Sequence, residues 1–338
     1  MRSMLLLCAL VASACTDPAT SPRTFSFGPF HLAAGEEVTD RCVSVTLHND
    51  QTMFVNAVEL EAATGIHHAN WFWVPEHVFP GSDGEWRCSD RAYSEAAAGV
   101  LGSVLFAMST QATHERQAFA PGVAIKIPPH AKLVAGLHLL DSGDEPLDVP
   151  LSLTLEPLAP SSVTTMLAGF VLEDHGLAIP PGQTSRFTVD CNLDPKHEEL
   201  LGRPIDFSIY YVLPHYHALG ARLTVEALRD GDGGADPVWT TEHRIGDALG
   251  GPLDPPMSLS GHSRLRLSCT FDNPRDATVG WGVGDQEMCM ALMFSDSPYT
   301  WQAGYLDETT PPGAGLSHDG LIEFTAPGCD VRAADATR

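Results

Sequence analysis

The stretch IDFSIYYVLPHYHALGARLTVEAL, residues 205 to 228, sets the fold prediction for the whole chain. An apolar, β-branched run from Ile205 to Val212 comes first, and an alternating run from Arg222 to Leu228 comes last. Both runs are typical of strands. Alternate side chains of a strand share one face, so His215 and His217 are predicted to reach the same metal ion. A His-x-His pair alone is more often a pair of exposed polar residues, and the rest of the chain must decide between these interpretations.

The composition of the other segments extends the strand prediction. Glycine (30 residues) and proline (26 residues) are plentiful, and long runs with helical periodicity are hard to find. Short alternating runs recur instead, at Glu37 to Thr46, Val149 to Leu155, Arg186 to Cys191 and Ser263 to Phe271. This pattern predicts an all-β sandwich fold. A length of 338 residues suggests about two domains, each with its own core.

The charge balance narrows the class of partner. The formal net charge is -24, and lysine and arginine together number only 19. No basic stripe is available to neutralise phosphates, which argues against a nucleic-acid partner. An acidic surface fits a soluble protein that stays dispersed outside the cytoplasm.

Residues 1–15 are predicted to be a secretory signal peptide. A short positive start, Met1-Arg2, precedes a compact apolar run from Met4 to Ala14 that is too short to span a bilayer. The run ends in small residues followed by Cys15, which resembles the lipobox of bacterial lipoproteins. Residues 16–23 would then form a tether, and a lipid on Cys15 would hold the protein in the periplasm or at the cell surface. Cleavage as an ordinary signal peptide is the alternative, and no other segment is long and apolar enough to cross a membrane.

Six cysteines follow the signal segment, and an even count in an exported chain predicts disulfides. They are Cys42, Cys88, Cys191, Cys269, Cys289 and Cys329. A predicted domain boundary between residues 158 and 163 leaves two cysteines before it and four after it. If bridges stay within domains, Cys42 pairs with Cys88, whereas the pairing of the other four stays open. Buried free thiols are the alternative, which an oxidising compartment disfavours.

Three histidines in the first half are candidate metal ligands. His67 and His68 are adjacent in an apolar, aromatic segment, and on a regular strand they would point to opposite faces. Binding one ion would therefore need a twisted or bulged backbone, or coordination through Nδ1. His138 lies in an otherwise apolar strand, where a satisfied core histidine is the simpler interpretation. Together the three imidazoles would suit zinc or copper, and His130, in a turn, is the competing candidate.

In the second half, Met288 decides which metal is predicted. It lies in a run of apolar residues, where a buried methionine is the default interpretation. As a ligand it would complete a set with His215 and His217. Thioether sulfur favours Cu(I), and zinc seldom accepts it. With Met288 as a ligand, the metal is therefore copper and the chemistry is redox.

These residues, taken in order, resemble a known family. The matching segments are His67-His68, the run Val134 to Leu140 around His138, His215-Tyr216-His217-Ala218-Leu219-Gly220, Cys269-Thr270-Phe271-Asp272-Asn273 and Glu287-Met288-Cys289. The chain resembles the copper type II, ascorbate-dependent monooxygenases, the group that contains peptidylglycine α-hydroxylating monooxygenase and dopamine β-monooxygenase. Each motif alone is weak, but the five occur in the family order and span nearly all of the mature chain.

The resemblance implies a fold, two metal sites and a reaction. The fold would be two tandem jelly-roll-like antiparallel β-sandwich domains, residues 24–158 and 163–331, facing a solvent cleft. His67, His68 and His138 would hold an electron-transfer copper, and His215, His217 and Met288 the catalytic copper that binds dioxygen. Two further disulfides, Cys191–Cys329 and Cys269–Cys289, follow by analogy. A monomer would then hydroxylate an activated C–H bond of a small molecule, with O2 and with ascorbate or a similar reductant.

The chain departs from the peptide-processing members of this family at several positions. Leu213 stands where they carry an arginine, and Met290 and Leu292 stand where they carry polar residues. By strand periodicity these side chains would line an apolar substrate wall. The predicted substrate is therefore apolar or aromatic rather than a peptide carboxylate. Near the first site, Ala69 and Gly136 replace the methionine and glutamine often found in the family.

Other functions fit part of the same pattern. A non-catalytic, surface-tethered copper-binding protein for storage or delivery would use the same ligands. A structural sandwich with incidental histidines is a third hypothesis. A zinc hydrolase is weaker, because it leaves Met288 unexplained. Most remaining histidines, among them His197 and His262, lie in polar or turn-like stretches and are predicted to be solvated.

Overall fold

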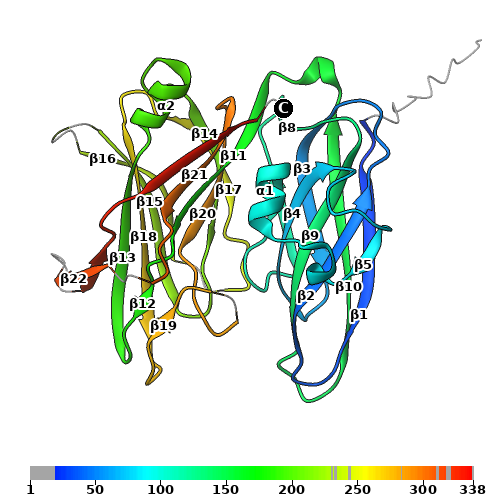
Figure 1. The fold of residues 1–338 in the computed structure, drawn as a ribbon, viewed down its shortest axis with the longest axis horizontal. Helices are drawn as coiled ribbons and strands as arrows, with labels where there is room; N and C mark the ends of the chain where they lie inside the picture. The colour runs from blue at the N-terminus through cyan, green and yellow to red at the C-terminus, as the bar shows by residue number, and fades with distance from the viewer. Residues whose placement is uncertain are drawn as a thin grey trace, which may run out of the picture.

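The computed structural model describes residues 20–229, 231, 234–242, 245–282, 284–309, 312–316 and 321–336. The predicted signal peptide with Cys15, and residues 16–19 of the predicted tether, lie outside this part of the chain. The described residues form mostly strands, with two short α-helices, α1 (Glu95–Leu101) and α2 (Asp194–Leu201). The all-β prediction is confirmed (Figure 1).

The first half, residues 20–158, is a sandwich of two strand layers. One layer contains β1 (Arg23–Leu32), β10 (Leu147–Leu158), β3 (Met53–Ala62), β8 (Val123–Ile127) and β7 (His114–Ala118). The other contains β5 (Gly84–Trp86), β2 (Glu37–Thr46), β9 (Ala131–Leu140), β4 (Ile66–Pro75) and β6 (Ser103–Ala107). A 3-10 turn, η2 (Cys88–Arg91), precedes α1.

The second half, residues 163–336, repeats this arrangement. Its first layer contains β11 (Thr165–Asp174), β20 (Met290–Ser295), β14 (Ser208–His215), β17 (Gly251–Ser258), β21 (Tyr299–Tyr305) and β24 (Asp330–Asp335). Its second contains β16 (Ala235–Thr241), β15 (Gly220–Leu228), β18 (Arg264–Asn273), β13 (Gln183–Asn192), β23 (Ile322–Thr325) and β22 (Gly313–Leu316). A small ladder pairs β12 (Ala178–Ile179) with β19 (Val279–Gly280).

The two halves are continuous with each other in both backbone pairing and core. After the 3-10 turn η3 (Pro160–Ser162), β11 pairs in parallel with β8, so one sheet runs through both halves. Tyr211, Leu213, Leu292 and Phe294 of the second half belong to the hydrophobic core of the first. Figure 1 shows the halves side by side, with β11, β17 and β20 of the second half toward the first. Because one sheet and one core cross the predicted boundary between residues 158 and 163, the division into two separate domains remains a prediction.

The alternating runs of the sequence became strands because each places one apolar face on a core. The run Glu37 to Thr46 coincides with β2, and the other three runs overlap β10, β13 and β18, with ends that differ by one to three residues. The last strand continues past the predicted end at residue 331, to Asp335. His197 and His262 are 0% and 6% exposed, so the prediction that they are solvated is wrong. Each has a hydrogen-bond partner, the Arg203 carbonyl and the Asp236 carboxylate, which makes its burial tolerable.

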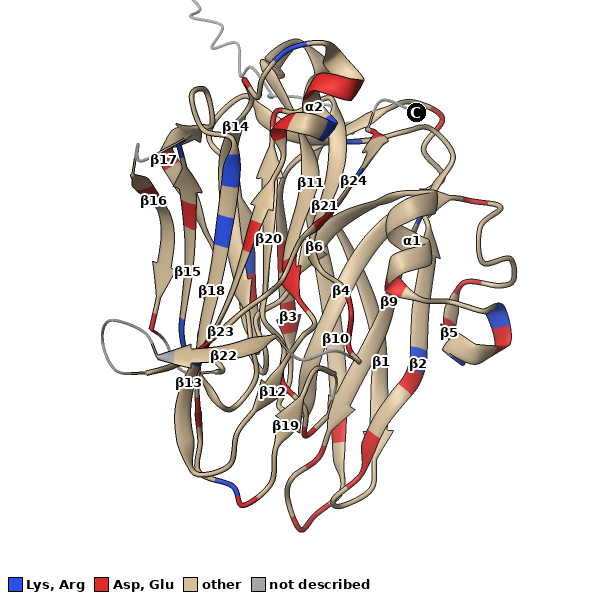
Figure 2. Ribbon diagram, turned by 60° about the vertical axis from the view of Figure 1, so that its left-hand side comes forward, with Lys and Arg blue, Asp and Glu red and all other residues tan. Residues whose placement is uncertain are grey.

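Three disulfides confirm the predicted pairs Cys42–Cys88, Cys191–Cys329 and Cys269–Cys289. They fit a non-reducing compartment. Figure 2 shows acidic positions spread over the ribbon of both halves, whereas two basic positions lie together on β18. Within the described residues, none of the helices has the length and apolar character that crossing a bilayer would require.

Candidate metal centre

The three candidate ligands of the first half lie together on β4 and β9. His68 is the partner of His138 across these strands, and the register shifts between Ile66 and His68. This β-bulge turns His67 toward the same side as His68, which regular alternation would prevent. One ring nitrogen from each of the three histidines lies within 4.8 Å of the other two. The bulged backbone that His67 and His68 would need in order to bind the same ion is therefore present.

The two histidines of the second half, His215 and His217, also lie side by side, but they do not share a strand face as predicted. Strand β14 ends at His215, and His217 belongs to the turn that follows. Their ring centroids are 5.2 Å apart. The turn is closed by Gly220, where a Cβ atom would lie 2.0 Å from the Tyr216 ring. Only glycine fits at this position, so a shared strand face is replaced by a tight turn that brings the two rings together.

All five histidines form a single cluster across the two halves. The His67 ring lies 4.3 Å from the His138 ring and 5.5 Å from the His217 ring, measured between centroids. The His68 ring lies 5.5 Å from the His215 ring and 6.0 Å from the His217 ring. The solvent cleft implied by the family resemblance is therefore closed at this point. Both predicted ligand sets contribute to one buried site.

The environment favours the neutral form of His67, His68, His215 and His217. Burial, together with the neighbouring His138 and His217, lowers the pKa of His67 to about 3. Burial also lowers the pKa of His68 and of His215 well below the usual value, and that of His217 to a lesser degree. A neutral imidazole has a lone pair that can bind a metal ion. These four histidines are therefore uncharged at neutral pH and available as metal ligands.

Several ring nitrogens of the cluster are buried and have no hydrogen-bond partner. They are Nδ1 of His67, both nitrogens of His68, Nδ1 of His138 and Nε2 of His217. Leaving so many polar atoms unpaired in an apolar interior is costly, and a bound metal ion would satisfy them. Imidazole nitrogen suits copper and zinc. The residues present therefore fit a metal centre.

Two contacts fix which nitrogen of a ring is available. Nε2 of His138 lies 2.7 Å from the Glu37 carboxylate, which can only accept, so the proton is on Nε2 and the Nδ1 lone pair is free. Nδ1 of His217 lies 2.8 Å from the Gln286 carbonyl, which leaves the Nε2 lone pair free. Such outer contacts orient metal-binding histidines in many proteins. Glu37 was not among the predicted site residues, because it is 101 positions from His138 in sequence.

A loop of the first half connects the two histidine groups. The His215 ring hydrogen-bonds the backbone of Met108, and the Thr110 hydroxyl donates to the Tyr216 carbonyl over 3.1 Å. The same loop reaches the first group, because the Gln111 amide donates to the His67 carbonyl over 2.6 Å. The loop spanning residues 108–111 therefore fixes the distance between the two groups. Its sequence, Met-Ser-Thr-Gln, carries no signal that would have predicted this role.

The carboxylate of Glu115 holds this loop by hydrogen bonds to Ser109. It accepts hydrogen bonds from the Ser109 amide over 2.5 Å and from the Ser109 hydroxyl over 2.9 Å. The Ser109 hydroxyl in turn accepts from the amide of Leu249 in the second half. Burial raises the pKa of Glu115 to about 7, and the two Ser109 contacts oppose that shift. Glu115 is therefore buried and linked through Ser109 to Leu249 of the second half.

The backbone around Met288 is tied to the cluster on both sides. The Glu287 carboxylate accepts from the amides of His217 and Leu219 over 2.7 and 2.6 Å. Cys289 is joined to Cys269, and Met290 is the partner of His215 across β14 and β20. Met288 itself is half-buried, in the segment between β19 and β20. Its chain position is therefore next to the second histidine pair.

The residues predicted to line an apolar substrate wall divide into two kinds. Leu213 and Leu292 are partners across β14 and β20, and they are 1% and 3% exposed inside the shared core. They are core residues here because the halves pack together, so they form no open wall. Met290 is half-buried and stays beside His215.

Polar groups lie next to this position. Glu173 is the partner of Met290 on β11, and its carboxylate binds Gln302 over 2.7 Å and His175 over 2.9 Å. The charge of Glu173 also acts on Glu95, which accepts a hydrogen bond from Asn70, two residues after His68. Carboxylates of the two halves are therefore close to each other near the cluster.

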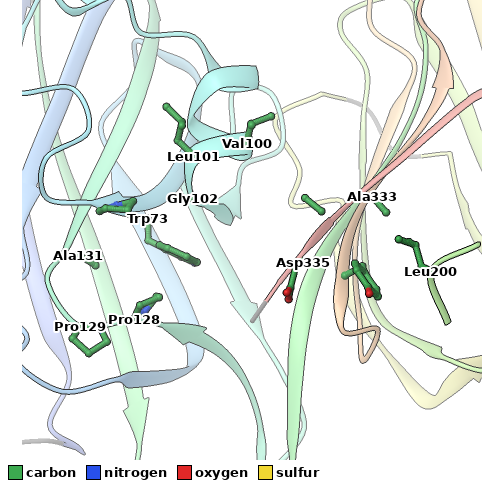
Figure 3. A pocket seen from close by; sticks show the side chains of 13 residues that line it. Trp73, Val100, Leu101, Gly102, Pro128, Pro129, Ala131, Leu200, Ala333 and Asp335 are labelled. Atoms are coloured by element: carbon green, nitrogen blue, oxygen red, sulfur yellow. The ribbon is translucent and has the colours of Figure 1, made fainter. Parts of the chain in front are cut away.

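A separate groove of about 620 Å³ lies between the halves. Figure 3 shows its apolar lining, with Trp73, Val100 and Leu101 on one side and Leu200 and Ala333 on the other. None of the six predicted metal ligands lines it. The groove is therefore distinct from the histidine cluster.

Comparison with known proteins assigns no family. No protein-family model and no curated protein matches the chain. Among solved structures, the major capsid protein P2 of bacteriophage PM2 is 9% identical, with a TM-score of 0.30 over 82% of this chain and 97% of that one. Peptide:N-glycanase F is 9% identical, with a TM-score of 0.33 over 91% and 98%. A putative secreted protein from Parabacteroides distasonis is 9% identical, with a TM-score of 0.20 over 83% and 90%. Such low scores carry no argument about function.

Proposed function

We propose that this chain is a copper-dependent monooxygenase that hydroxylates an activated C–H bond with O2 and a one-electron reductant such as ascorbate. The observation that carries the proposal is the cluster of five buried histidines with unpartnered ring nitrogens. As a ligand with His215 and His217, Met288 would add a soft thioether donor, which favours copper over zinc. The motif resemblance supplies the reaction class.

Bound copper would supply one-electron transfer and the activation of dioxygen. His67, His68 and His138 would hold one ion, and His215, His217 and Met288 the other. The protein's own work is to keep these imidazoles oriented and shielded from water. Burial lowers the pKa values of four of them, and Glu37 and the Gln286 carbonyl set the tautomers of His138 and His217. Glu287 holds the turn that carries His217.

The surroundings of the cluster favour a substrate without negative charge. Glu37, Glu95 and Glu173 lie around the histidines and Met290. A substrate carboxylate would be repelled by these like charges, whereas a neutral aromatic or aliphatic group would not. The expected substrate is therefore a small, largely apolar molecule and not a glycine-extended peptide.

The site of action would be outside the cytoplasm. Three disulfides support a non-reducing compartment. The sequence before residue 20 supports export and a lipid on Cys15, which would make the protein a periplasmic or surface-anchored monomer. Mass spectrometry of the mature protein would detect the lipid on Cys15, and a mature chain starting elsewhere without lipid would contradict it.

The test is oxygen uptake by the copper-loaded protein. We expect ascorbate-dependent O2 consumption that rises on adding a neutral aromatic C–H substrate, with a hydroxylated product detected by mass spectrometry. His217→Ala should abolish the substrate-dependent part, and His130→Asn, outside the cluster, should retain it. A carboxylate-bearing analogue of the same substrate should have a higher KM. Copper loading without any substrate-dependent uptake would reject the enzyme.

The second candidate is a copper-binding protein for storage or delivery. One observation favours it: Leu213 and Leu292 fill the space where an open substrate wall was predicted. Stoichiometric copper binding, no turnover in the uptake experiment, and copper release to a competing chelator would select this alternative.

A further inference from the structure

The further inference concerns His68, which differs from the other histidines of the cluster. Both of its ring nitrogens are buried and have no hydrogen-bond partner. Among the described histidines, no other has both nitrogens in this condition. The residue is 6% exposed, so water cannot readily serve the second nitrogen. A neutral imidazole that used one nitrogen as a ligand would leave the other as a buried, unpaired group.

The His68 ring also has histidines on two sides. The rings of His67 and His138, from the first half, lie 5.4 and 5.1 Å from it. Those of His215 and His217, from the second half, lie 5.5 and 6.0 Å from it. Since the two groups come from different halves, His68 stands where the halves meet. A nitrogen of His68 lies within 4.8 Å of nitrogens of His67 and His138, and the rings of His215 and His217 are 5.5 and 6.0 Å from the His68 ring between centroids.

The ring spacings meet the geometric condition for two metal ions. With metal–nitrogen bonds of about 2.0–2.1 Å, two rings bound to one ion have centroids roughly 4.4–6.0 Å apart for bond angles of about 90–150°. The set His68, His67 and His138 has spacings of 4.3, 5.1 and 5.4 Å. The set His68, His215 and His217 has spacings of 5.2, 5.5 and 6.0 Å. Both sets are close to or within that range with His68 as the shared member.

We propose that His68 bridges two metal ions through its two ring nitrogens, with His67 and His138 completing one side and His215 and His217 the other. The bridging form is an imidazolate. As the second ion binds, the N–H bond of the ring breaks, the proton leaves to solvent, and the freed lone pair forms the new metal–nitrogen bond. No electron is transferred in this step. The bridge rests on the two-copper loading of the proposed function but not on monooxygenase activity.

The bridge gives a role to the closed arrangement of the halves. Two ions that share an imidazolate are magnetically coupled in the Cu(II) state, whereas ions at separate sites are not. The bridge would also tie β4 of the first half to the end of β14 in the second. The metal centre would then contribute directly to holding the two halves together.

The experiment compares copper content with electron paramagnetic resonance spin count in the oxidised, copper-loaded full chain. The expected result is about two copper ions per chain, following the two sets of ligands, and a spin count far below the copper content. His68→Gln should restore a spin count equal to whatever copper remains. His130→Asn should behave like the unaltered protein, and circular dichroism should verify that each variant is folded.

Two results would overturn the bridge. Two coppers with a full spin count in the unaltered protein would mean separate sites, and fewer than two coppers would remove the second ion. Spin loss that persists in His68→Gln would also overturn it, because another group would then couple the ions. The measurement on the unaltered protein decides even if His68→Gln fails to fold. A coupled spectrum without ascorbate-dependent oxygen uptake would reject the monooxygenase and leave the bridge standing.

Discussion

At the scale of single residues, Glu37 shows how an outer contact prepares a ligand. Its carboxylate lies 2.7 Å from His138 Nε2 and directs the free lone pair of Nδ1 toward His67 and His68. Glu37 also approaches Gly284 of the second half, where a Cβ atom would lie 3.2 Å from its carboxylate. Gly284 has a φ of +66°, so both its conformation and this close approach favour glycine.

Removing this carboxylate should weaken metal binding at the first site. We expect Glu37→Ala to lower copper affinity there by about 10- to 100-fold, because the His138 ring loses its orientation. Glu37→Gln keeps an acceptor and should lose less. Competitive titration against a chelator of known affinity measures both, with Glu145→Gln, in an exposed loop, as the control. An unchanged affinity in Glu37→Ala would show that the contact is only structural.

Glu115 gives the protein a stability that depends on pH. Its pKa is raised by burial from 4.5 to about 7, so the folded protein holds this proton more tightly than the unfolded chain does. The stability contribution is complete below about pH 4.5 and is lost as pH rises to about 7, by up to about 3 kcal/mol. Glu115→Gln removes this titration and retains an acceptor for the Ser109 amide.

The difference in unfolding free energy between Glu115→Gln and the unaltered protein should therefore grow in favour of the variant from about pH 4.5 to pH 7 and then level off. Urea unfolding at a series of pH values in that range measures it. Using the difference removes the contributions of the histidines, which both proteins share. A difference that stays constant with pH would contradict the raised pKa.

At the scale of elements, the segment before β20 is held by the Cys269–Cys289 disulfide. We expect the double variant Cys269→Ala with Cys289→Ala to lose about 3 kcal/mol of stability, from the loop entropy of a 20-residue separation. Met288 precedes Cys289, so we expect its sulfur to be displaced from the copper when the bridge is lost. The copper–sulfur contribution to X-ray absorption of the Cu(I) form should then disappear.

The matched control is the pair Cys42→Ala with Cys88→Ala. That bridge closes a 46-residue separation in the first half, so a stability loss of about 4 kcal/mol is expected. Neither cysteine is next to Met288 in the chain, so the copper–sulfur contribution should remain. Loss of the sulfur signal in both variants would point to general unfolding, and its retention in both would contradict the link between the bridge and Met288.

The strands and the disulfides were largely predictable, whereas the contacts between elements were not. Alternation in β2 and in the run before His215 reports burial of one face, which is a local property. The turn at His217 was missed because Gly220 matters only through the Tyr216 ring packed against it. The contacts of residues 108–111 with both histidine groups, and that of Glu37 with His138, join residues far apart in the chain, and no spacing in the sequence predicts them.

At the scale of the whole molecule, the two halves are predicted to unfold together. They share one sheet through β8 and β11 and one core through Leu213 and its neighbours. Leu60→Ala in the first core and Leu223→Ala in the second should each cost about 2–5 kcal/mol, because both side chains are fully buried. Each should shift a single calorimetric transition of the metal-free protein as a whole.

Independent halves would give a different calorimetric result. Leu60→Ala would then lower one transition and Leu223→Ala another, and the two would separate on the temperature axis. The sequence indicated two domains because length and a Pro- and Ser-containing stretch near residue 160 suggested a boundary. It did not indicate their fusion, since the apolar residues of β14 and β20 fit equally well in the core of the second half alone.

The burial of the five histidines also governs how fast metal can enter. They are 2–6% exposed, so an ion in solution has no direct approach to them in the closed form. Uptake by the folded, metal-free protein must wait for a local opening between the halves, and we expect its rate to become independent of copper concentration when copper is abundant. The ion present while the second half folds onto the first is then trapped. The timing of supply during export, more than equilibrium preference among metals, would determine which metal the mature protein carries.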